Sequence, residues 1–490
     1  MNDNAASEIL RSFHRACVLV IGDVMLDRFI YGAVERISPE APIPVMSIER
    51  SLDMLGGAAN VARNVATLGG KAILIGVVGE DAPAVDLMAQ FKLVPTIRAH
   101  LIRDASRRTT VKTRHVADRQ QILRTDVEDT APLSEGVAQE VLARYLVELE
   151  KADVVVVSDY AKGTLSDPVV ATVISAARHA GKLVLVDPKA TSYRKYRGAT
   201  ILTPNRHELQ AACGRECASD DQVVAGAEAL LSQDICEAFV VTRGKAGISI
   251  IPREGAPTHL RAAAQEVFDV SGAGDTAVAT LALGLCSGAD LVTAANLANL
   301  AAGVVVGKPG TASVTAGEVN ARLAQVEEEH PTRKYFNLEG VQQLVSRWRE
   351  LNLRIAFTNG CFDLLHPGHL SLLKQARASA DRLVVGLNSD LSVRRLKGPG
   401  RPAQGEVARA TVLASLKTVD AVIIFEDDTP LELITALRPD VLVKGADYAL
   451  QEVVGADQVQ SWGGKVILAD VVPAQSTSST IQRIAAVDRS

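Results

Sequence analysis

The chain has 490 residues, of which 47% are hydrophobic and 22% charged, and its formal net charge at pH 7 is −5. At roughly 100 to 200 residues per domain, this length predicts about three domains, and the composition excludes a disordered or fibrous chain. Residues 1–330 hold 33 basic against 40 acidic side chains, and residues 331–490 hold 19 against 17. Because neither part is basic, binding to the phosphate backbone of nucleic acids is not expected.

The sequence pattern does not predict export or membrane insertion. The first ten residues, MNDNAASEIL, lack the basic and then apolar layout of a secretory signal, and the six cysteines form no C-x-x-C pair. The most apolar stretch, 276–306, is interrupted by Asp290, Asn296 and Asn299, which are costly in lipid. We therefore expect a cytoplasmic protein with reduced thiols, no membrane partner, and buried Ala-rich helices over 276–306.

Short apolar runs in the first two thirds of the chain predict the buried strands of a parallel sheet. These runs lie at 18–23, 72–76, 154–157, 183–187, 200–203 and 238–242. Helical patterns separate several of them, as over 134–149 and 221–231, and the aromatic content of only 4% fits helices packed on both faces of a sheet. We expect an α/β fold with a doubly wound sheet, in which ligands bind at the carboxyl ends of the strands.

Residues 109–127 depart from this rhythm. Polar and apolar residues alternate on both sides of a turn near Asp118, and this alternation predicts an antiparallel hairpin that is half exposed to solvent. Such a hairpin would serve as a small antiparallel lid or as the surface of a homodimer.

A polar and charged segment from Gln325 to Asn337 has the composition of an interdomain linker, so we place a boundary near Pro331. Five further strand patterns follow, at 354–358, 382–388, 421–425, 441–444 and 465–468. They predict a second, smaller Rossmann-like domain that binds a nucleotide. The expected organisation is a first domain at 1–318, a linker at 319–340 and a second domain at 341–490.

The first group of residues that indicates chemistry reads Asp269-Val-Ser-Gly-Ala-Gly-Asp-Thr276 and opens a helical stretch. A loop of small residues at a helix start leaves N–H groups free to hold phosphate oxygens, and the helix dipole adds to the attraction. Gly272, Ala273 and Gly274 are therefore predicted to cradle the phosphates of ATP. Asp275 is placed to take the proton of a hydroxyl that attacks the γ-phosphate. The alternative is a plain Gly-rich helix cap with Asp275 as a first-turn carboxylate.

This run resembles the C-terminal signature of the ribokinase/PfkB family of sugar kinases, and further segments match that family in order over about residues 12–318. The resemblance implies that the first strand end and a Gly-Gly signature hold the substrate, through Asp23, Asp27, Gly56, Gly57 and Asn60. It implies that an N-x-x-E element and a later turn contact ATP, through Asn205, Arg206, His207, Glu208, Thr242 and Gly244. Glu208 would also act indirectly on Mg²⁺. Val270 departs from the Thr of many relatives, so we expect no side-chain contact there.

Structural roles compete with several of these assignments. Asp23 can cap the turn that follows it, the Gly56-Gly57 pair can serve tight packing, and Glu208 can be an ordinary acid of a first helical turn. Lys162 and Lys189 follow strands and can reach a substrate phosphate, although lysines at such positions are more often solvated. We include both lysines among the predicted substrate-binding residues.

The second group reads Thr358-Asn-Gly-Cys-Phe-Asp-Leu-Leu-His-Pro-Gly-His369 and follows the first strand of the second domain. His366 and His369 fall on one side of a first helical turn, with Pro367 where its missing N–H costs little. A zinc pair is the alternative, but Cys361 is the only cysteine of this domain, and further ligands do not stand at suitable spacing. A purely structural histidine pair is a further alternative.

The H-x-G-H element is similar to that of the cytidylyltransferase-like nucleotidyltransferases. The resemblance implies that both imidazoles donate to phosphate oxygens while a substrate phosphate attacks the α-phosphorus and pyrophosphate leaves, with no covalent enzyme intermediate. It also implies ATP contacts from the loop, from a strand-end lysine and from an S-T-[ST] element, through Thr358, Gly360, Phe362, Asp363, Lys444, Ser476, Thr477, Ser478 and Arg483. The alternative for Lys444 is a solvated lysine in a turn.

Fused in this order, the two parts resemble the bifunctional enzymes of bacterial ADP-heptose synthesis over nearly the whole chain, including Lys397-Gly-Pro-Gly-Arg-Pro402 and Lys444-Gly-Ala-Asp-Tyr448. The resemblance implies phosphorylation of D-glycero-β-D-manno-heptose 7-phosphate at its anomeric hydroxyl with Asp275 as base, and transfer of AMP from ATP to heptose 1-phosphate. A separate phosphatase must remove the 7-phosphate between the two steps, and the pathway feeds the lipopolysaccharide core.

Two alternatives stay open. The sequence does not declare adenine over cytosine, so the same parts fit the synthesis of a CDP-polyol or of another nucleotide sugar. A nucleotide-sensing or scaffold module with degenerate motifs is the non-enzymatic alternative, and the intact Asp275, His366 and His369 oppose it.

Overall fold

The computed structural model describes residues 3–117, 120–189, 191–263, 268–329, 334–445 and 449–470. The chain divides into two compact units, Met1–Ala324 and Gln325–Ser490. The turn predicted near Asp118 and the boundary predicted near Pro331 lie outside the described residues. Across the described part of the chain, every helix is too short or too polar to cross a membrane.

The first unit is built on a nine-stranded sheet in the order β13-β12-β11-β10-β9-β8-β1-β4-β5. Its strands are parallel from β5 to β11, and β12 and β13 are antiparallel to their neighbours. The bounds are β1 Cys17–Gly22, β4 Lys71–Val78, β5 Ile97–Arg103, β8 Val154–Ser158, β9 Leu183–Asp187, β10 Ala199–Leu202, β11 Cys236–Thr242, β12 Ile248–Pro252 and β13 Thr258–Leu260. The predicted doubly wound sheet is therefore confirmed.

Helices cover both faces of this sheet because alternate strand residues point to opposite sides. One face packs under α4 Glu135–Leu149, α5 Asp167–His179, α6 Arg206–Cys213 and α7 Asp220–Leu231, in a core that includes Leu19, Val155 and Phe239. The other face carries α2 Ala58–Thr67, α8 Ala273–Cys286 and α9 Leu291–Val305. The last two are the predicted buried Ala-rich helices. A further helix, α3 Ala82–Lys92, packs against the strand β3 Pro44–Gly57, and α1 Asp3–Ser12 opens the chain.

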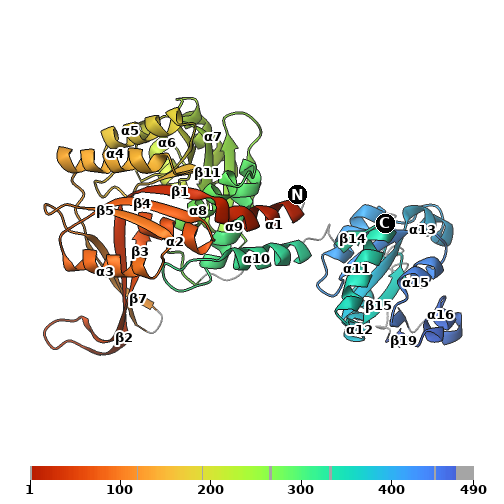
Figure 1. Ribbon diagram of the computed structural model, residues 1–490. Helices are drawn as coiled ribbons and strands as arrows, with labels where there is room; N and C mark the ends of the chain where they lie inside the picture. The colour runs from red at the N-terminus through yellow and green to blue at the C-terminus, as the bar shows by residue number, and fades with distance from the viewer. Residues whose placement is uncertain are drawn as a thin grey trace, which may run out of the picture. The chain divides into compact units, whose positions relative to one another are not determined.

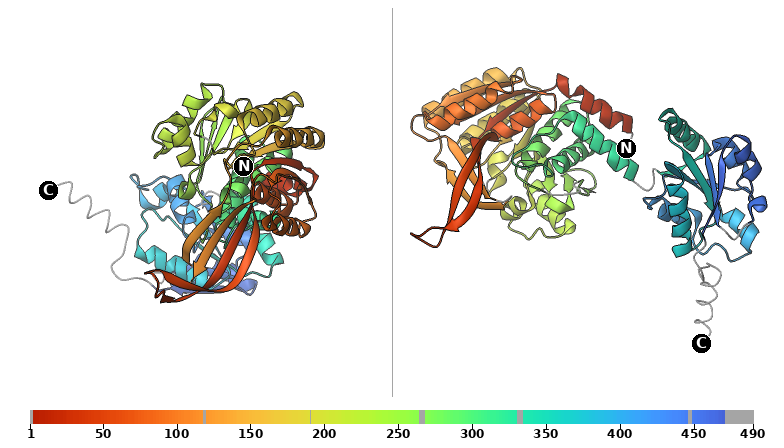
Figure 2. Two further views of the ribbon diagram at one scale, coloured as in Figure 1. Left: turned by 90° about the vertical axis from the view of Figure 1, so that its left-hand side faces the viewer. Right: turned by 90° about the horizontal axis from the view of Figure 1, so that it is seen from below.

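A second, four-stranded sheet, called the lid sheet below, projects from the body of the first unit (Figures 1 and 2). It runs in the order β3-β2-β6-β7, with β2 Val24–Ile37, β3 Pro44–Gly57, β6 Thr110–Ala117 and β7 Gln120–Val127. The predicted hairpin is its β6–β7 half. The sheet is not purely antiparallel as predicted, because β2 and β6 pair in parallel. The long β2–β3 hairpin was missed, since the first strand was predicted at 18–23 and no strand was predicted after it, although only Asp23 separates β1 from β2.

The segment predicted as a linker contains regular structure at both ends. The helix α10 Ala316–Glu329 continues through its first half, and Val319 and Leu323 are buried. A short strand, β14 Tyr335–Phe336, and the start of α11 Leu338–Glu350 fall in its second half. The segment is polar partly because it includes the exposed side of α10, and not only because it connects the two units.

The second unit is a six-stranded parallel sheet in the order β14-β17-β16-β15-β18-β19. Its five longer strands match the predicted ones: β15 Ile355–Gly360, β16 Arg382–Asn388, β17 Ala421–Phe425, β18 Val441–Gly445 and β19 Lys465–Ala469. One face packs on α11, α15 Leu431–Leu437 and α16 Ala456–Ser461, and the other on α12 Pro367–Ala378 and α14 Glu406–Ala414. A further helix, α13 Asp390–Lys397, follows β16. The strand order reverses between β15 and β18, where such sheets bind ligands.

Candidate active sites

Asp275 is the centre of the first site. It stands in the first turn of α8, and only 3% of its surface is exposed. Its Oδ1 accepts a hydrogen bond from the Tyr160 hydroxyl at 2.7 Å, and its Oδ2 accepts one from Asn60 Nδ2 at 2.6 Å. Burial raises the pKa of Asp275 to about 6, although these two hydrogen bonds and the Arg63 charge oppose the shift. A carboxylate with a pKa near neutrality suits a general base.

The loop before Asp275 requires glycine at one position. Gly272 has φ of 78°, and a Cβ there would lie 2.8 Å from Asn60 Nδ2. Larger residues would therefore push Asn60 away from Asp275. Gly272, Ala273 and Gly274 stand at the start of α8 and are at least partly exposed, so the helix start is open to an anion.

Asp27 and Asp23 differ in what their carboxylates contact. Asp27 faces the lid, where its Oδ1 accepts from Arg114 Nη1 at 2.7 Å, and a Cβ on Gly56 would lie 2.6 Å from its Oδ2. Asp23 accepts instead from the backbone N–H groups of Tyr160, Lys162 and Thr164. These three hydrogen bonds favour the structural alternative for Asp23, because its oxygens hold the loop that carries Tyr160. Gly57, with φ of 56°, approaches the Asp23 carbonyl, where a Cβ would lie at 2.5 Å.

The predicted ATP-contacting residues of the first unit gather at the ends of β10 and β11. Asn205 and Glu208 form a capping box at the start of α6, and Thr242 bridges to Asn205. Lys189 Nζ donates to Glu208 Oε1 at 2.7 Å. Part of the Glu208 carboxylate is therefore used by the helix cap. Three others lie on the rim: Arg206, which reaches the Ala218 carbonyl, and the exposed His207 and Gly244.

Asp187 is a site residue that the predictions missed. It ends β9 and is half-buried, and its pKa is raised well above the ordinary value by burial and by the charges of Asp275 and Glu208. A carboxylate short of positive charge and next to a phosphate cradle fits Mg²⁺, which binds one or two carboxylates together with substrate phosphates. Its position as the last residue of a predicted parallel strand was the available signal.

Two lysines approach the same site from the lid side. Lys162 pairs with Glu128, with 2.8 Å between Nζ and Oε1. Lys112, on β6, places its Nζ 5.8 Å from the centroid of the Tyr160 ring, and its pKa is lowered by burial and by the charge of Lys162. The predictions missed Lys112 because nothing in the hairpin pattern showed which face would meet the site.

In the second unit, His366 and His369 stack at the start of α12, with ring centroids 3.8 Å apart. Burial lowers the pKa of both, and the pKa of His369 falls to about 4 with further contributions from His366 and Lys397. Both rings are therefore neutral at pH 7. Among the described residues, the Nδ1 atoms of the two rings find no hydrogen-bond partner, and no group of three possible metal ligands gathers anywhere.

The loop between β15 and α12 places further polar groups beside the histidines. The Thr358 hydroxyl and the Asn359 side-chain oxygen are buried without a partner within the described part of the chain. Phe362 has φ of 42°, and its ring packs against His369 with centroids 5.1 Å apart. Gly360 lies against the Phe362 ring. Such buried unpaired groups are costly unless a ligand satisfies them.

Asp363 and Lys444 support this loop. Asp363 accepts from Arg401 Nε at 2.5 Å and from the Ala403 N–H at 2.6 Å, so its carboxylate anchors the neighbouring loop. Lys444 Nζ donates to the Asn359 carbonyl at 3.4 Å from the end of β18. The predicted Ser476, Thr477, Ser478 and Arg483 lie outside the described residues.

Arg409 is a second residue that the predictions missed. Only 1% of its surface is exposed, and it donates to the Cys361, Asn388 and Gln404 carbonyls and to Asp390 Oδ1. It therefore ties the histidine loop to the end of β16. An arginine inside a helical pattern gave no signal of this role.

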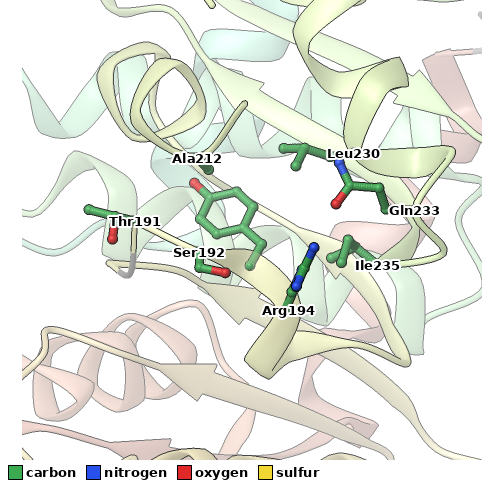
Figure 3. A pocket seen from close by; sticks show the side chains of 8 residues that line it. Thr191, Ser192, Arg194, Ala212, Leu230, Gln233 and Ile235 are labelled. Atoms are coloured by element: carbon green, nitrogen blue, oxygen red, sulfur yellow. The ribbon is translucent and has the colours of Figure 1, made fainter. Parts of the chain in front are cut away.

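A cavity of about 290 Å³ opens elsewhere in the first unit, beside α6 and α7. Thr191 and Ser192 line one side, and Gln233 and Ile235 line the other (Figure 3). None of the residues predicted for either site lines it.

Two family models match the chain, and each covers one of the two candidate sites. The pfkB family carbohydrate kinase model matches residues 15–317, and the Cytidylyltransferase-like model matches residues 357–483. The chain is similar to the bifunctional protein HldE of Caulobacter sp. (strain K31), with 54% identity over 98% of both chains. It is also similar to that of Paramagnetospirillum magneticum, with 51% identity over 98% of this chain and 99% of the other.

Two solved structures share the fold of the first unit. Phosphofructokinase-2 from Escherichia coli has a TM-score of 0.54 at 19% identity, covering 63% of this chain and 99% of its own. Ribokinase from Arabidopsis thaliana has a TM-score of 0.51 at 19% identity, covering 63% and 98%. The ribokinase-like fold of the first unit is thus confirmed.

Replacing Arg409 by Met is expected to destabilise the second unit by at least about 3 kcal/mol, because three carbonyls lose a buried donor. Urea unfolding measures this loss, with tryptophan fluorescence as the signal. Both tryptophans of the chain, Trp348 and Trp462, lie in the second unit, so the signal reports on that unit. Arg394→Met, at an exposed position of α13, is the matched control. Equal midpoints of urea unfolding for Arg409→Met and Arg394→Met would contradict the role of Arg409.

Proposed function

The chain belongs to the family of the bifunctional protein HldE, and from this premise we propose which residues carry each of its two reactions. The family joins a heptose 7-phosphate kinase to a heptose 1-phosphate adenylyltransferase, and both activities use ATP. The kinase belongs to the first unit and the adenylyltransferase to the second. The separate groups around Asp275 and around the His366–His369 pair support this division.

In the kinase reaction, Asp275 takes the proton of the anomeric hydroxyl as its oxygen attacks the γ-phosphorus of ATP and ADP leaves. The two hydrogen bonds from Tyr160 and Asn60 hold the carboxylate in one orientation, which favours proton transfer. The start of α8 from Gly272 to Gly274 receives the phosphate oxygens that gain charge. Asp27 faces the same space and would bind sugar hydroxyls.

We propose that Mg²⁺ accompanies ATP in this site. Asp187 and the remaining lone pairs of Glu208 would hold it through oxygen or through bound water. When bound, it would neutralise charge on the β- and γ-phosphates.

In the adenylyl transfer, the phosphate of heptose 1-phosphate attacks the α-phosphorus of ATP, and pyrophosphate leaves. The neutral imidazole of His366 donates its N–H to a phosphate oxygen. His369, whose ring also bonds the Leu364 backbone, donates from its other nitrogen once the nearby phosphates have raised its pKa and protonated it. The Thr358 hydroxyl and the free Nη2 of Arg401 add donors beside them, both being unpartnered within the described residues. Stabilisation of the developing charge by fixed donors is sufficient for this step.

Asp275→Asn and His369→Ala are expected to separate the two activities. Loss of the base should lower the kinase rate by about 10²–10⁴-fold, and loss of the phosphate donor should lower pyrophosphate release by about 10²–10³-fold. Each variant should keep the other activity, which shows that the change acts on one site alone, and circular dichroism of both variants checks that the altered unit is folded. The assay supplies full-length protein with ATP and either heptose 7-phosphate or heptose 1-phosphate, and follows ADP and pyrophosphate. A full kinase rate in Asp275→Asn would refute the base assignment.

We propose that Lys112 and Lys162 bind the 7-phosphate of the sugar. Lys162 has Glu128 as its partner, whereas Lys112 makes no ion pair among the described residues. The side chain of Tyr160 contacts both the proposed base and Lys112. Its hydroxyl donates to Asp275, and Lys112 Nζ lies near the face of its ring. A half-buried cation near the ring of Tyr160, whose hydroxyl bonds the proposed base, fits an anion at the far end of a single sugar.

Lys112→Met is expected to raise the KM for heptose 7-phosphate by about tenfold to a hundredfold, because a charge-assisted hydrogen bond contributes about 1.5 to 3 kcal/mol. The same change should not alter the KM for heptose that lacks the 7-phosphate, supplied as a comparison substrate. Lys92→Met, at an exposed position of α3, is the matched control. If the KM rises equally for the sugar with and without the 7-phosphate, Lys112 does not recognise the phosphate.

We propose that two copies of the chain pair through the lid sheet as a homodimer. Large apolar side chains are exposed on this sheet: Ile37, Ile43, Ile48, Leu52, Ile122, Leu123 and Val127. Such a gathering is typical of an interface rather than of a monomer surface.

Light scattering of the full chain should give about twice 51.9 kDa, and Ile48→Glu should reduce the mass to one chain because it buries a charge in the interface. Val85→Glu is the control, since Ile48 and Val85 are both 63% exposed but Val85 lies on α3. A mass of one chain for the unaltered protein would exclude the dimer.

We further propose that the enzyme acts in the cytoplasm, with sugar phosphates and ATP as its partners and without nucleic acid. All six cysteines are free thiols in the structure, as in proteins of reducing compartments. The formal charge of −5 does not favour binding to the phosphate backbone of a nucleic acid.

A further inference from the structure

Arg63 lies behind the proposed catalytic base, on the same helix as Asn60. It stands on α2, and its guanidinium extends toward the loop that follows α9. Its Nη2 donates to Asn60 Oδ1 at 2.7 Å and also to the Thr311 carbonyl. Neither the predicted motifs nor the mechanism above assigns it a role.

The contact with Asn60 determines which way that amide faces. An asparagine side chain has its acceptor on one side and its donors on the other. Because Asn60 Oδ1 accepts from Arg63, and from Asn64 Nδ2 at 3.3 Å, its Nδ2 must face Asp275 Oδ2. Without Arg63, the orientation of the amide would rest on the longer contact from Asn64 and on the bond to Asp275 itself.

Arg63 also balances the charges that surround Asp275. The carboxylates of Asp27 on β2 and Asp187 at the end of β9 repel a negative charge on Asp275. Tyr160, on the loop after β8, contributes a neutral hydroxyl, and Arg114 of the lid is paired with Asp27. Arg63 is the cation that acts on Asp275 itself. Burial makes such an interaction stronger than it would be in water.

We propose that Arg63 is a positioning residue of the kinase site, which turns the Asn60 amide toward Asp275 and stabilises the ionised carboxylate. It does not touch the reacting atoms, so its effect passes through Asn60 and through its charge. The inference depends on the proposed role of Asp275 as the base. The Asp275→Asn variant tests that role separately, so the two proposals can fail independently.

Arg63→Met and Arg63→Lys in the full chain test this role through the pH dependence of the kinase reaction. The base must be ionised, so kcat/KM for the kinase falls as the pH drops through the pKa of Asp275, near 6. Removal of an opposite charge raises a carboxyl pKa by about one unit or more. The acid limb of Arg63→Met should therefore move upward by about one pH unit. Its kcat should also fall about tenfold at pH 7, with little change in the KM for ATP.

Arg63→Lys keeps the charge and should return the acid limb toward its original pH. Circular dichroism reports any unfolding of the first unit, and adenylyl transfer by the second unit normalises the amount of chain. Arg144→Met, at an exposed position of α4, controls for the loss of an arginine. A merely structural Arg63 would lower the amount of active enzyme without moving the acid limb. An unchanged limb in Arg63→Met, or an equal shift in the Met and Lys variants, would overturn the proposal.

Discussion

Both sites depend on one constraint: the carboxyl ends of parallel strands meet the N-terminus of a helix at the point where the strand order reverses. In the first unit, β1, β8 and β9 end at this point beside the start of α8. In the second, β15 and β18 end beside the start of α12. The unpaired N–H groups of a helix start attract phosphate, and the strand ends supply side chains at fixed positions. The same backbone device therefore serves two reactions that cleave ATP at different phosphorus atoms.

Burial shifts the pKa of the central side chains in opposite directions in the two sites. In the kinase site, burial raises the pKa of Asp275 toward neutrality, which makes the carboxylate a better acceptor of a proton. In the second site, burial lowers the pKa of His366 and His369 and keeps them neutral before ATP arrives. Buried polar groups destabilise a fold unless they are held in place. Asn60 and Tyr160 perform this task for Asp275, and Arg409 performs it for the histidine loop.

The sequence predicted the sheets and the central residues because both have strong local signals. Apolar runs located the buried strands, a loop of small residues before a helix indicated Asp275, and the H-x-G-H spacing indicated the histidine pair. Roles that depend on a partner distant in the chain could not be predicted. Asp23 was predicted to bind substrate, with a cap of the following turn as the alternative, yet its oxygens are used by three N–H groups of the distant 160–164 loop. Arg63 and Lys112 carry no motif, and their roles arise only from residues brought beside them by folding.

The chemistry of the two steps requires the sugar to leave the first site before it reaches the second. The kinase makes a bisphosphate, whereas the adenylyltransferase accepts a sugar phosphorylated at the anomeric oxygen alone, so hydrolysis of a phosphomonoester must intervene. The proposed role of Lys112 and Lys162 suits the first requirement, since a pair of cations in the kinase site would favour the sugar that carries the 7-phosphate. The order of the reactions is then set by which phosphates each pocket recognises. Joining the units in one chain does not by itself impose that order.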